Sequence, residues 1–311
     1  MNKTLISIVT PTKNEFQNIE KLTLEIQKTF ENLAINYEHI IIDNDSTDGT
    51  IEIIKKLAEQ NSKIKVILNA SDYGQIRSPF YGMLQTSGDA VIFITSDFET
   101  PIEIVPELIS KWEQKKYKVI FTKRVSSDES YLLKRLRSAF YVFLKKISKL
   151  KLGANITGEG IYDREVIEIF KKNTDPFPFL RAMVPELGIE YDTVEFKQIK
   201  RKHGKSKNNF FSLFELALSS ATKYSVFPAK LFINFGFICS FFSILIAMVF
   251  FIYKILFWNS FELGIAPIVI GVFFLSSIQI CILGIIGQYI TFVLEYQKNL
   301  PLVIEKERIN F

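Results

Sequence analysis

The sequence has few of the residues that hold small extracellular scaffolds together. Its 311 residues include two cysteines, Cys239 and Cys281, which are too few for a disulfide framework. It contains no internal repeat, no low-complexity tract and no Gly/Ser-rich linker. Hydrophobic residues make up 48% of the chain, and so much apolar surface excludes an intrinsically disordered protein. The length predicts about two domains.

Acidic residues are absent from two basic stretches. Lys134–Lys151 carries seven Lys and Arg residues, and Lys197–Lys207 carries six. The whole chain has 38 basic and 33 acidic residues, so the net charge of +5 belongs to these stretches and the remainder is acidic. Apolar residues interleave Lys134–Lys151, which is typical of an amphipathic helix on an anionic membrane surface. Nucleic acid is disfavoured as a partner because two long apolar runs follow in the chain.

These two uncharged apolar runs lie near the C-terminus. Leu231–Tyr253 has 23 residues and Ile265–Leu294 has 30, whereas a helix of roughly 20 residues crosses a bilayer. The alternative is a pair of buried helices, but soluble helices of this length usually have a polar stripe. Basic residues flank the pair at Lys223, Lys230 and Lys298. The sequence therefore predicts a membrane hairpin with both termini in the cytoplasm.

The first 125 residues alternate between strand-like and helix-like segments. Strands are predicted at Leu5–Thr10, Ile40–Ile42, Ile64–Leu68, Ala90–Ile94 and Lys118–Phe121, and helices at Asn18–Leu33, Thr50–Leu57 and Gln75–Gln85. This alternation predicts an α/β fold with a mostly parallel sheet. Ligands of such sheets bind beyond the carboxyl ends of the strands.

Polar clusters follow the first two predicted strands. Pro11–Glu15 stands directly before a helix, whose first N–H groups suit an anionic ligand. The alternative is an ordinary connection in which Asn14 caps the helix. Asp43–Thr50 follows the second strand, where Asp48 can cap the next helix. The functional alternative is an acidic or amide side chain that holds a base N–H or ribose hydroxyls.

A third cluster follows the fourth strand. Asp97 and Glu99 are two residues apart, so both face one side if the strand conformation continues. Two carboxylates together with a diphosphate would make an oxygen site for Mg²⁺ or Mn²⁺. A solvated acidic turn before a helix explains the pair equally well.

Taken in order, these segments resemble the motifs of family 2 glycosyltransferases with the Rossmann-like GT-A fold. The nearest subgroup is the polyprenyl-phosphate enzymes, similar to dolichyl-phosphate mannose synthase. The resemblance covers nearly the whole chain. It rests on Ser7–Glu15, Ile41–Thr50, Asn69–Gly88, Gly88–Pro101, Lys123–Arg124, Gly158–Arg164, Asp175–Arg181, Arg201–Asn208 and Gly284–Pro301.

The resemblance implies a set of nucleotide-sugar-binding residues. They are Pro11, Lys13, Glu15, Ile42, Asp43, Asn44, Ser96, Asp97 and Arg124. Asn44 stands where the family usually has a second Asp, and Lys13 where it usually has Tyr. An amide can still bond a ribose hydroxyl or base edge, and Lys13 can meet phosphate.

The resemblance also implies the metal and catalytic residues. Asp97 and Glu99 would hold Mg²⁺ or Mn²⁺, although Thr95 replaces the first Asp of the family's metal motif. Asp97, Arg124 and Glu159 are the catalytic candidates. Gly158 stands where many relatives carry an Asp that is assigned as a base; Glu159 is its substitute, or the acceptor phosphate needs none. Phosphate binding falls to Arg201, Lys205 and Lys207, since guanidinium and ammonium groups suit phosphate.

The implied organisation has five parts. They are a nucleotide-sugar-binding core (1–125), an acceptor and membrane-facing segment (126–207), a juxtamembrane amphipathic helix (208–230), two transmembrane helices (about 231–253 and 266–290, within 231–294) and a cytoplasmic tail (295–311). The resemblance implies an integral protein of a bacterial-type inner (plasma) membrane with a cytoplasmic catalytic domain. It also favours a homo-oligomer, with a tetramer as one form.

The expected activity is metal-dependent, inverting transfer of a hexose from a UDP- or GDP-sugar to a polyprenyl phosphate such as undecaprenyl phosphate. Two alternatives stay open at this point. The acceptor could be a glycan or a protein. The chain could also be a non-catalytic membrane scaffold, an idea motivated by Thr95 and Gly158.

Overall fold

The computed structural model describes residues 4–126, 153, 155–173, 175–198, 265–298 and 300–311, with isolated positions between 235 and 257. The chain forms two compact units. The first comprises Met1–Lys145, Leu150–Lys207 and Asn299–Phe311, and the second comprises Lys146–Lys149 and Asn208–Lys298. The functional residues predicted for the nucleotide all belong to the first unit.

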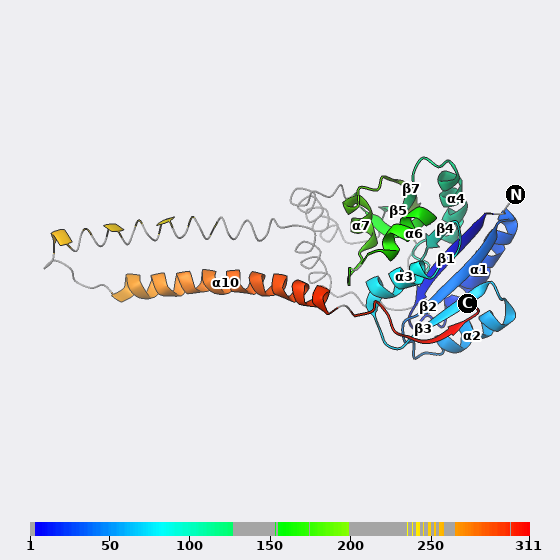
Figure 1. The fold of residues 1–311 in the computed structure, drawn as a ribbon, viewed down its shortest axis with the longest axis horizontal. Coiled ribbons are helices and arrows are strands. Elements are labelled where there is room, and N and C mark those ends of the chain that lie inside the picture. The colour runs from blue at the N-terminus through cyan, green and yellow to red at the C-terminus, as the bar shows by residue number, and fades with distance from the viewer. Residues whose placement is uncertain are drawn as a thin grey trace. The chain divides into compact units, whose positions relative to one another are not determined.

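An eight-stranded sheet is the centre of the first unit (Figure 1). Its order is β7-β5-β6-β4-β1-β2-β3-β8. β1 pairs in parallel with β2 and β4, β2 with β3, and β5 with β7, while the other three pairs are antiparallel. The predicted α/β fold with a mostly parallel sheet is therefore confirmed. The strands are β1 (Leu5–Thr12), β2 (Asn36–Asp43), β3 (Ile64–Asn69), β4 (Ala90–Phe93), β5 (Val119–Ser126), β6 (Ile156–Asp163), β7 (Tyr191–Lys197) and β8 (Glu305–Ile309).

Helices pack on both faces of the sheet because the strand residues alternate between faces. Ile40 and Ile42 join one core cluster, and Ile41 between them joins another. The helices are α1 (Ile19–Leu33), α2 (Thr50–Gln60), α3 (Gly74–Leu84), the 3₁₀ turn η1 (Ile102–Ile104), α4 (Val105–Glu113), α6 (Arg164–Lys171) and α7 (Leu180–Glu186). α1 and α4 contribute to the cluster around Ile6 and Ile8, and α3, α6 and α7 to the cluster around Val9.

Helical spacing in the sequence accounts for these contacts. In α1 the buried residues Leu22, Ile26 and Phe30 recur every fourth position and pack with Trp112 of α4. Each such side chain contributes about 1.5–3 kcal/mol when it is fully removed from water. By packing against the strands, the helices fix the positions of the strand ends and therefore of the polar loops that follow them.

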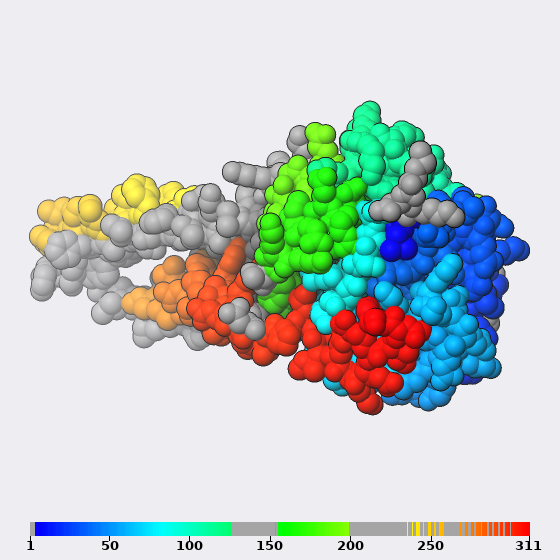
Figure 2. Space-filling view, turned by 45° about the vertical axis from the view of Figure 1, so that its right-hand side comes forward, coloured from blue at the N-terminus to red at the C-terminus, as the bar shows by residue number. Residues whose placement is uncertain are grey.

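The C-terminal residues contribute a strand where the sequence predicts a cytoplasmic tail. β8 pairs antiparallel with β3, and Asn310 Nδ2 donates to the carbonyls of Ala58 and Ile64 at 2.7 and 2.9 Å. In Figure 2 this segment, in red, lies beside the light-blue residues of α2 and β3. Its sequence, Glu-Lys-Glu-Arg-Ile, lacks the apolar alternation of a half-buried strand, as edge strands often do.

The second apolar run is a single helix, α10 (Ile265–Gln297). Most of the first run, the basic stretch 134–151 and the juxtamembrane segment 208–230 lie outside the described residues. Across the part of the chain that the structure describes, no helix combines the length and hydropathy that crossing a bilayer requires.

Gly160 permits the close approach of β5 and β6. Its φ is +146°, and a Cβ there would lie 2.1 Å from the carbonyl oxygen of Ile120 and 2.9 Å from the Cα of Phe121. Both neighbours are backbone atoms in the middle of the sheet, so no side chain can move aside. A residue other than glycine would force the two strands apart.

We therefore expect Gly160→Ala to lower the free energy of unfolding by about 3 kcal/mol or more, since overpacking and backbone strain add. Gly188→Ala is the matched control, because Gly188 has φ +72° and a Cβ there would meet no atom within 4 Å. We expect the control to cost about 1 kcal/mol. Thermal unfolding of the detergent-solubilised chain measures both. Equal midpoints for the two variants would contradict the packing described.

Candidate functional site

The parallel register brings four strand ends to one edge of the sheet. Thr12 pairs with Asp43, Asp43 with Leu68, and Val9 with Phe93. The loops that follow β1, β2, β3 and β4 therefore leave the sheet side by side. This is the edge at which ligands of parallel sheets bind.

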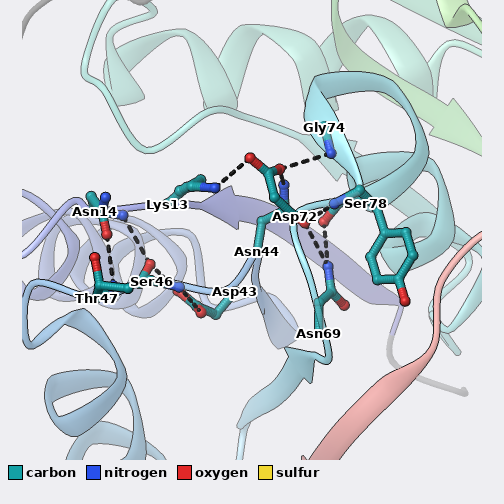
Figure 3. A network of polar contacts seen from close by, with 11 residues as sticks. Lys13, Asn14, Asp43, Asn44, Ser46, Thr47, Asn69, Asp72, Gly74 and Ser78 are labelled. Atoms are coloured by element: carbon teal, nitrogen blue, oxygen red, sulfur yellow. Dashed lines mark hydrogen bonds and ion pairs between the residues drawn. The ribbon is translucent and has the colours of Figure 1, made fainter.

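The loops after β1 and β2 are tied together by hydrogen bonds (Figure 3). The backbone N–H of Asn14 donates to Ser46 Oγ, and Asn14 Oδ1 accepts from the N–H of Thr47, both at 2.8 Å. Asp48 accepts from the N–H groups of Phe16 and Thr50 at 3.2 and 3.1 Å. Asp48 thus accepts from the first N–H of α2, whose N-cap residue is Gly49, whereas Asn14 does not cap α1 and connects the two loops instead.

Asp43 and Ile42 are buried. Asp43 is 0% exposed and its carboxylate accepts from the N–H of Ser46 at 2.9 Å and from the Ser46 hydroxyl. Burial raises the pKa of Asp43, with the Ser46 hydrogen bonds opposing and the nearby Asp45 and Asp48 charges reinforcing the rise. The Ile42 side chain, predicted at the nucleotide, packs in the core instead. Asp43 shapes its loop in this structure.

Asn44, Lys13 and Asp72 form a second polar group at this edge (Figure 3). Asn44 Nδ2 donates to Asp72 Oδ1, and the Lys13 ammonium pairs with Asp72 Oδ2. Asn44 Oδ1 accepts from Asn69 Nδ2 at 3.0 Å and from the N–H of Tyr73 at 2.9 Å. We call Lys13, Asn44, Asn69 and Asp72 the Asn44 cluster. It joins the ends of β1, β2 and β3.

The loop after β4 does not continue as a strand. β4 ends at Phe93, and Phe98 has a positive φ of 57° while its ring packs against the core. Asp97 Oδ1 accepts from the N–H of Glu99 at 3.1 Å and from the Thr95 hydroxyl at 2.9 Å. The strand geometry considered for Asp97 and Glu99 is therefore wrong, and a turn sets their relative position.

Glu159 reaches the same loop from β6. Glu159 Oε1 lies 2.6 Å from the Thr95 hydroxyl, and Oε2 accepts from the Thr100 hydroxyl. Burial raises the pKa of Glu159 to about 7, opposed by the Thr100 and Thr95 hydrogen bonds and reinforced by the Asp97 charge. The Thr95 hydroxyl has one hydrogen and can donate it to only one of the two carboxylates, Asp97 or Glu159, at a time. Both hydrogen bonds form together when Glu159 is protonated, because Glu159 then donates to the Thr95 oxygen and Thr95 donates to Asp97.

Arg124 approaches the loop from β5. Its Nη2 lies 3.5 Å from Glu99 Oε2, which also accepts from Gln198 Nε2 at 2.8 Å. The Arg124 Nε is buried and has no hydrogen-bond partner among the described residues. Ser96 Oγ donates to the Pro11 carbonyl at 3.0 Å and joins this loop to β1. Six of the predicted site residues thus lie together around the loop after β4. They are Pro11, Ser96, Asp97, Glu99, Arg124 and Glu159.

The predicted metal ligands are Asp97 and Glu99. Over the described ranges, no group of three or more His, Cys, Asp or Glu side chains is arranged to hold a metal ion. Arg201, Lys205 and Lys207, the predicted phosphate-binding residues, lie outside the described residues. Glu15, another predicted residue, accepts from Asn18 Nδ2 at 2.6 Å at the start of α1.

A family match covers the part of the chain that carries this geometry. Residues 7–170, which include the Asn44 cluster and Asp97 to Glu159, match the family described as "Glycosyl transferase family 2". This chain belongs to glycosyl transferase family 2. The predicted membership is confirmed, and the glycosyltransferase resembles curated proteins well beyond the matched residues.

Two similar curated proteins and one solved structure illustrate the extent of the similarity. The bactoprenol glucosyl transferase of Shigella phage SfX is 29% identical over 97% of this chain and 99% of that protein. The putative glycosyltransferase CsbB of Bacillus subtilis (strain 168) is 28% identical over 99% of this chain and 93% of its own. The crystal structure of mannosyl-3-phosphoglycerate synthase from Rubrobacter xylanophilus has a TM-score of 0.53 at 15% identity, covering 71% of this chain and 73% of that one. The last shows a shared GT-A-type fold.

Sequence reasoning missed several residues of this glycosyltransferase site. Asp72, Thr100 and Gln198 each form a hydrogen bond with a predicted site residue. The sequence singles out the acidic residues that follow β1, β2 and β4, and these three residues are not among them. Asp72 lies within Asn69–Gly88, one of the segments of the family resemblance, where its position three residues after β3 was the available signal. Gln198 follows β7, which only the fold places near Glu99.

The protonation of Glu159 has a measurable effect on the stability of the glycosyltransferase. The folded-state pKa of about 7 lies above the ordinary value of 4.5, so folding stability falls as pH rises from 4.5 to 7 and levels off above that. The stability lost over this window is about 3 kcal/mol. Glu159→Gln keeps a donor toward Thr95 and an acceptor toward Thr100, so we expect it to remove this slope.

Urea titrations at pH 5, 6, 7 and 8 in metal-free buffer, followed by tryptophan fluorescence, measure the slope. The control is Glu103→Gln, because Glu103 is exposed on η1 and should leave the wild-type slope unchanged. An unchanged slope in Glu159→Gln would show that Glu159 is ionised throughout.

Proposed function

We propose that this protein transfers a hexose from a nucleotide sugar to a polyprenyl phosphate, with inversion, on the cytoplasmic face of a bacterial-type plasma membrane. The observation that carries the proposal is the extent of the similarity to the bactoprenol glucosyl transferases. It spans 97% of this chain, well beyond residues 7–170 of the family match. The aligned region therefore includes the two uncharged apolar runs, which we propose as the membrane hairpin.

The donor diphosphate fits the group around the β4 loop. Arg124 offers a guanidinium whose buried Nε lacks an acceptor among the described residues, and phosphate oxygens would satisfy it. Carboxylate oxygens of Asp97 and Glu99 are the hard ligands that Mg²⁺ and Mn²⁺ prefer, with the diphosphate completing the set. When bound, the metal would supply charge stabilisation for the leaving diphosphate. Arg201, Lys205 and Lys207 remain the proposed phosphate-binding residues of the basic stretch.

The reaction is a single in-line displacement. An oxygen of the acceptor phosphate forms a bond to the anomeric carbon while the bond from that carbon to the diphosphate oxygen breaks. The nucleoside diphosphate leaves with the electron pair, and its charge is the main target of stabilisation. The acceptor phosphate is already an anion, so the attack requires no general base.

Gly158 is consistent with a reaction that needs no base. Its φ is +91°, and a Cβ there would lie 3.9 Å from the backbone N and the Cβ of Arg181. Among the described residues, no carboxylate oxygen lies within 4 Å of that Cβ position. Glu159 next to it has both oxygens engaged by Thr95 and Thr100. We assign Glu159 to holding the β4 loop, through which it positions Asp97.

Two further parts of the proposal concern assembly. The membrane hairpin would keep the sheet unit near the bilayer surface where the phosphate of the lipid emerges. Homo-oligomerisation, with a tetramer as one form, would follow from the resemblance to polyprenyl-phosphate enzymes.

Product analysis with a metal-site variant tests the function. The purified full chain is incubated with undecaprenyl phosphate, Mg²⁺ or Mn²⁺ and a panel of UDP- and GDP-hexoses, and the lipid product is identified by mass. We expect a lipid-linked hexose from one donor, and a loss of about 100-fold or more in Asp97→Asn, because the metal that would neutralise the leaving diphosphate loses a charged ligand. Glu103→Gln, an exposed acid outside the site, should retain the wild-type rate.

Two results would oppose the proposal. Transfer to a glycan or protein but never to the lipid would identify the other acceptor class. Absence of both transfer and nucleotide binding in the wild type would identify a scaffold.

A further inference from the structure

The chain returns to the sheet unit at its C-terminus. Residues 300–311, which we call the C-terminal segment, follow α10 in the sequence and include β8. In Figure 1 this segment, in red, passes α3 and pairs with β3. The predicted cytoplasmic tail is thus part of the fold, and its contacts indicate what it does there.

One short stretch of the C-terminal segment contacts both ends of the β3–α3 loop (residues 70–73). The N–H of Ala70, directly after β3, donates to the Ile304 carbonyl at 2.9 Å. Arg77 Nη2, near the start of α3, donates to the Pro301 carbonyl at 3.3 Å. Pro301 and Ile304 are three residues apart in the sequence. This stretch therefore spans the loop from its entry to its exit.

Apolar and polar contacts anchor the C-terminal segment independently of the loop. The Val303 side chain is 4% exposed, and Leu302 packs against the core cluster that includes Phe80 of α3. Further along, Lys55 Nζ of α2 lies 2.5 Å from Glu307 Oε2. The segment thus provides fixed backbone carbonyls to which the loop and α3 can bond.

The β3–α3 loop itself is mostly exposed to solvent. Residues 70–72 are exposed, so polar contacts hold the loop more than apolar burial does. On the side of the Asn44 cluster, the N–H of Tyr73 donates to Asn44 Oδ1 and the N–H of Gly74 to Asp72 Oδ1, both at 2.9 Å. On its other side, the loop contacts the C-terminal segment. Without the segment, such a loop would open locally at a low free-energy cost.

We propose that the C-terminal segment positions the β3–α3 loop at the candidate site, with Arg77 as the positioning residue on α3. In addition to its bond with Pro301, the Arg77 guanidinium lies 5.9 Å from the centre of the Phe177 ring, within the range of a cation–π contact. Arg77 thus connects α3, the C-terminal segment and the segment before α7. The consequence for the reaction rests on the proposed function, because the loop lies at the edge where we place the donor.

Hydrogen–deuterium exchange of the detergent-solubilised full chain, resolved to single amides and without ligand, tests the positioning. Val303→Asp introduces a charge at the buried anchor and should release the segment. Ile304→Asp is the matched control, because the neighbouring Ile304 side chain is 57% exposed. The decisive amides are those of Tyr73 and Gly74, which bond the Asn44 cluster and not the segment. We expect both to exchange about 10-fold faster in Val303→Asp, the factor for loss of one net hydrogen bond, and less than about 2-fold faster in the control.

A second pair of variants leaves the buried anchor in place. Arg77→Met removes the donor to Pro301 and keeps a long unbranched side chain. Arg164→Met is its control, because Arg164 Nε also donates to a backbone carbonyl, that of Gly88 at 2.7 Å, but at the opposite edge of the sheet. We expect faster exchange at the two decisive amides in Arg77→Met only. Slow exchange within β1 and β4 shows that a variant is folded, and if Val303→Asp is not, the arginine pair decides.

Steady-state kinetics separate positioning from general destabilisation. In Val303→Asp and Arg77→Met we expect the KM for the nucleotide sugar to rise about 10-fold and kcat to change less than about 3-fold, because ordering the loop costs affinity and leaves the chemical step unchanged. Faster exchange with an unchanged KM would overturn the role in the reaction.

The failure of this inference can be distinguished from that of the proposed function. Equal exchange of Tyr73 and Gly74 in each variant and its control would overturn the positioning and leave the proposed function intact. A wild-type chain with neither transfer nor nucleotide binding would overturn the proposed function, and the exchange of the ligand-free chain would still decide the positioning.

Discussion

The parallel pairing of β1 with β2 and β4 is the constraint on which the site depends. Because the three strands run in one direction, Thr12, Asp43 and Phe93 end at the same edge, and each is followed by a loop of polar residues. No loop builds the site alone. Asn14 forms hydrogen bonds with Ser46 and Thr47 that connect the loops after β1 and β2, and Ser96 donates to the Pro11 carbonyl, which connects the loop after β4 to β1. A change in register would move whole loops apart rather than single side chains.

The two halves of the site handle charge differently. Around β4, Glu159 is buried and its pKa is raised to about 7 by burial, so a neutral carboxyl can support Asp97 through Thr95 without adding a second negative charge. Around β3, the Asp72 carboxylate pairs with the Lys13 ammonium. Burial thus favours the neutral form of one acid, and a cation lies beside the other.

The sequence predicts the central strands because their apolar runs are bounded by polar loops, as at Leu5–Thr12 and Ile64–Asn69. It does not predict β6 or β8. β6 is rich in glycine because β5 approaches it closely at Gly160, and β8 is a charged edge strand far along the chain from β3. Both strands form backbone hydrogen bonds with strands far away in the sequence, and such pairing leaves no local periodicity in the sequence to detect.

Site residues also divide into those that the local sequence indicates and those that depend on contacts between distant residues. Asp97 and Arg124 are predicted because they lie close to the ends of recognisable strands and match a family motif, and the structure places both residues at the β4 loop. The turn that orients Asp97 could not, since it depends on Phe98 adopting a positive φ with its ring in the core. The contacts of Asp72 with Lys13 and Asn44 could not be predicted either, because these partners are 59 and 28 residues away in the sequence. The burial of the Ile42 side chain in the core also depends on the packing of the whole sheet.

We propose that the nucleotide binds at the edge formed by the ends of β1 to β4. Hydrogen–deuterium exchange of the full chain, with and without the nucleotide that binds it and Mg²⁺, measures where the ligand protects the backbone. We expect slower exchange in residues 12–15, 43–48, 70–74 and 95–100, with the opposite edge, around Leu5 and Asp89, unchanged. Protection confined to other segments, or equal protection of both edges, would contradict it.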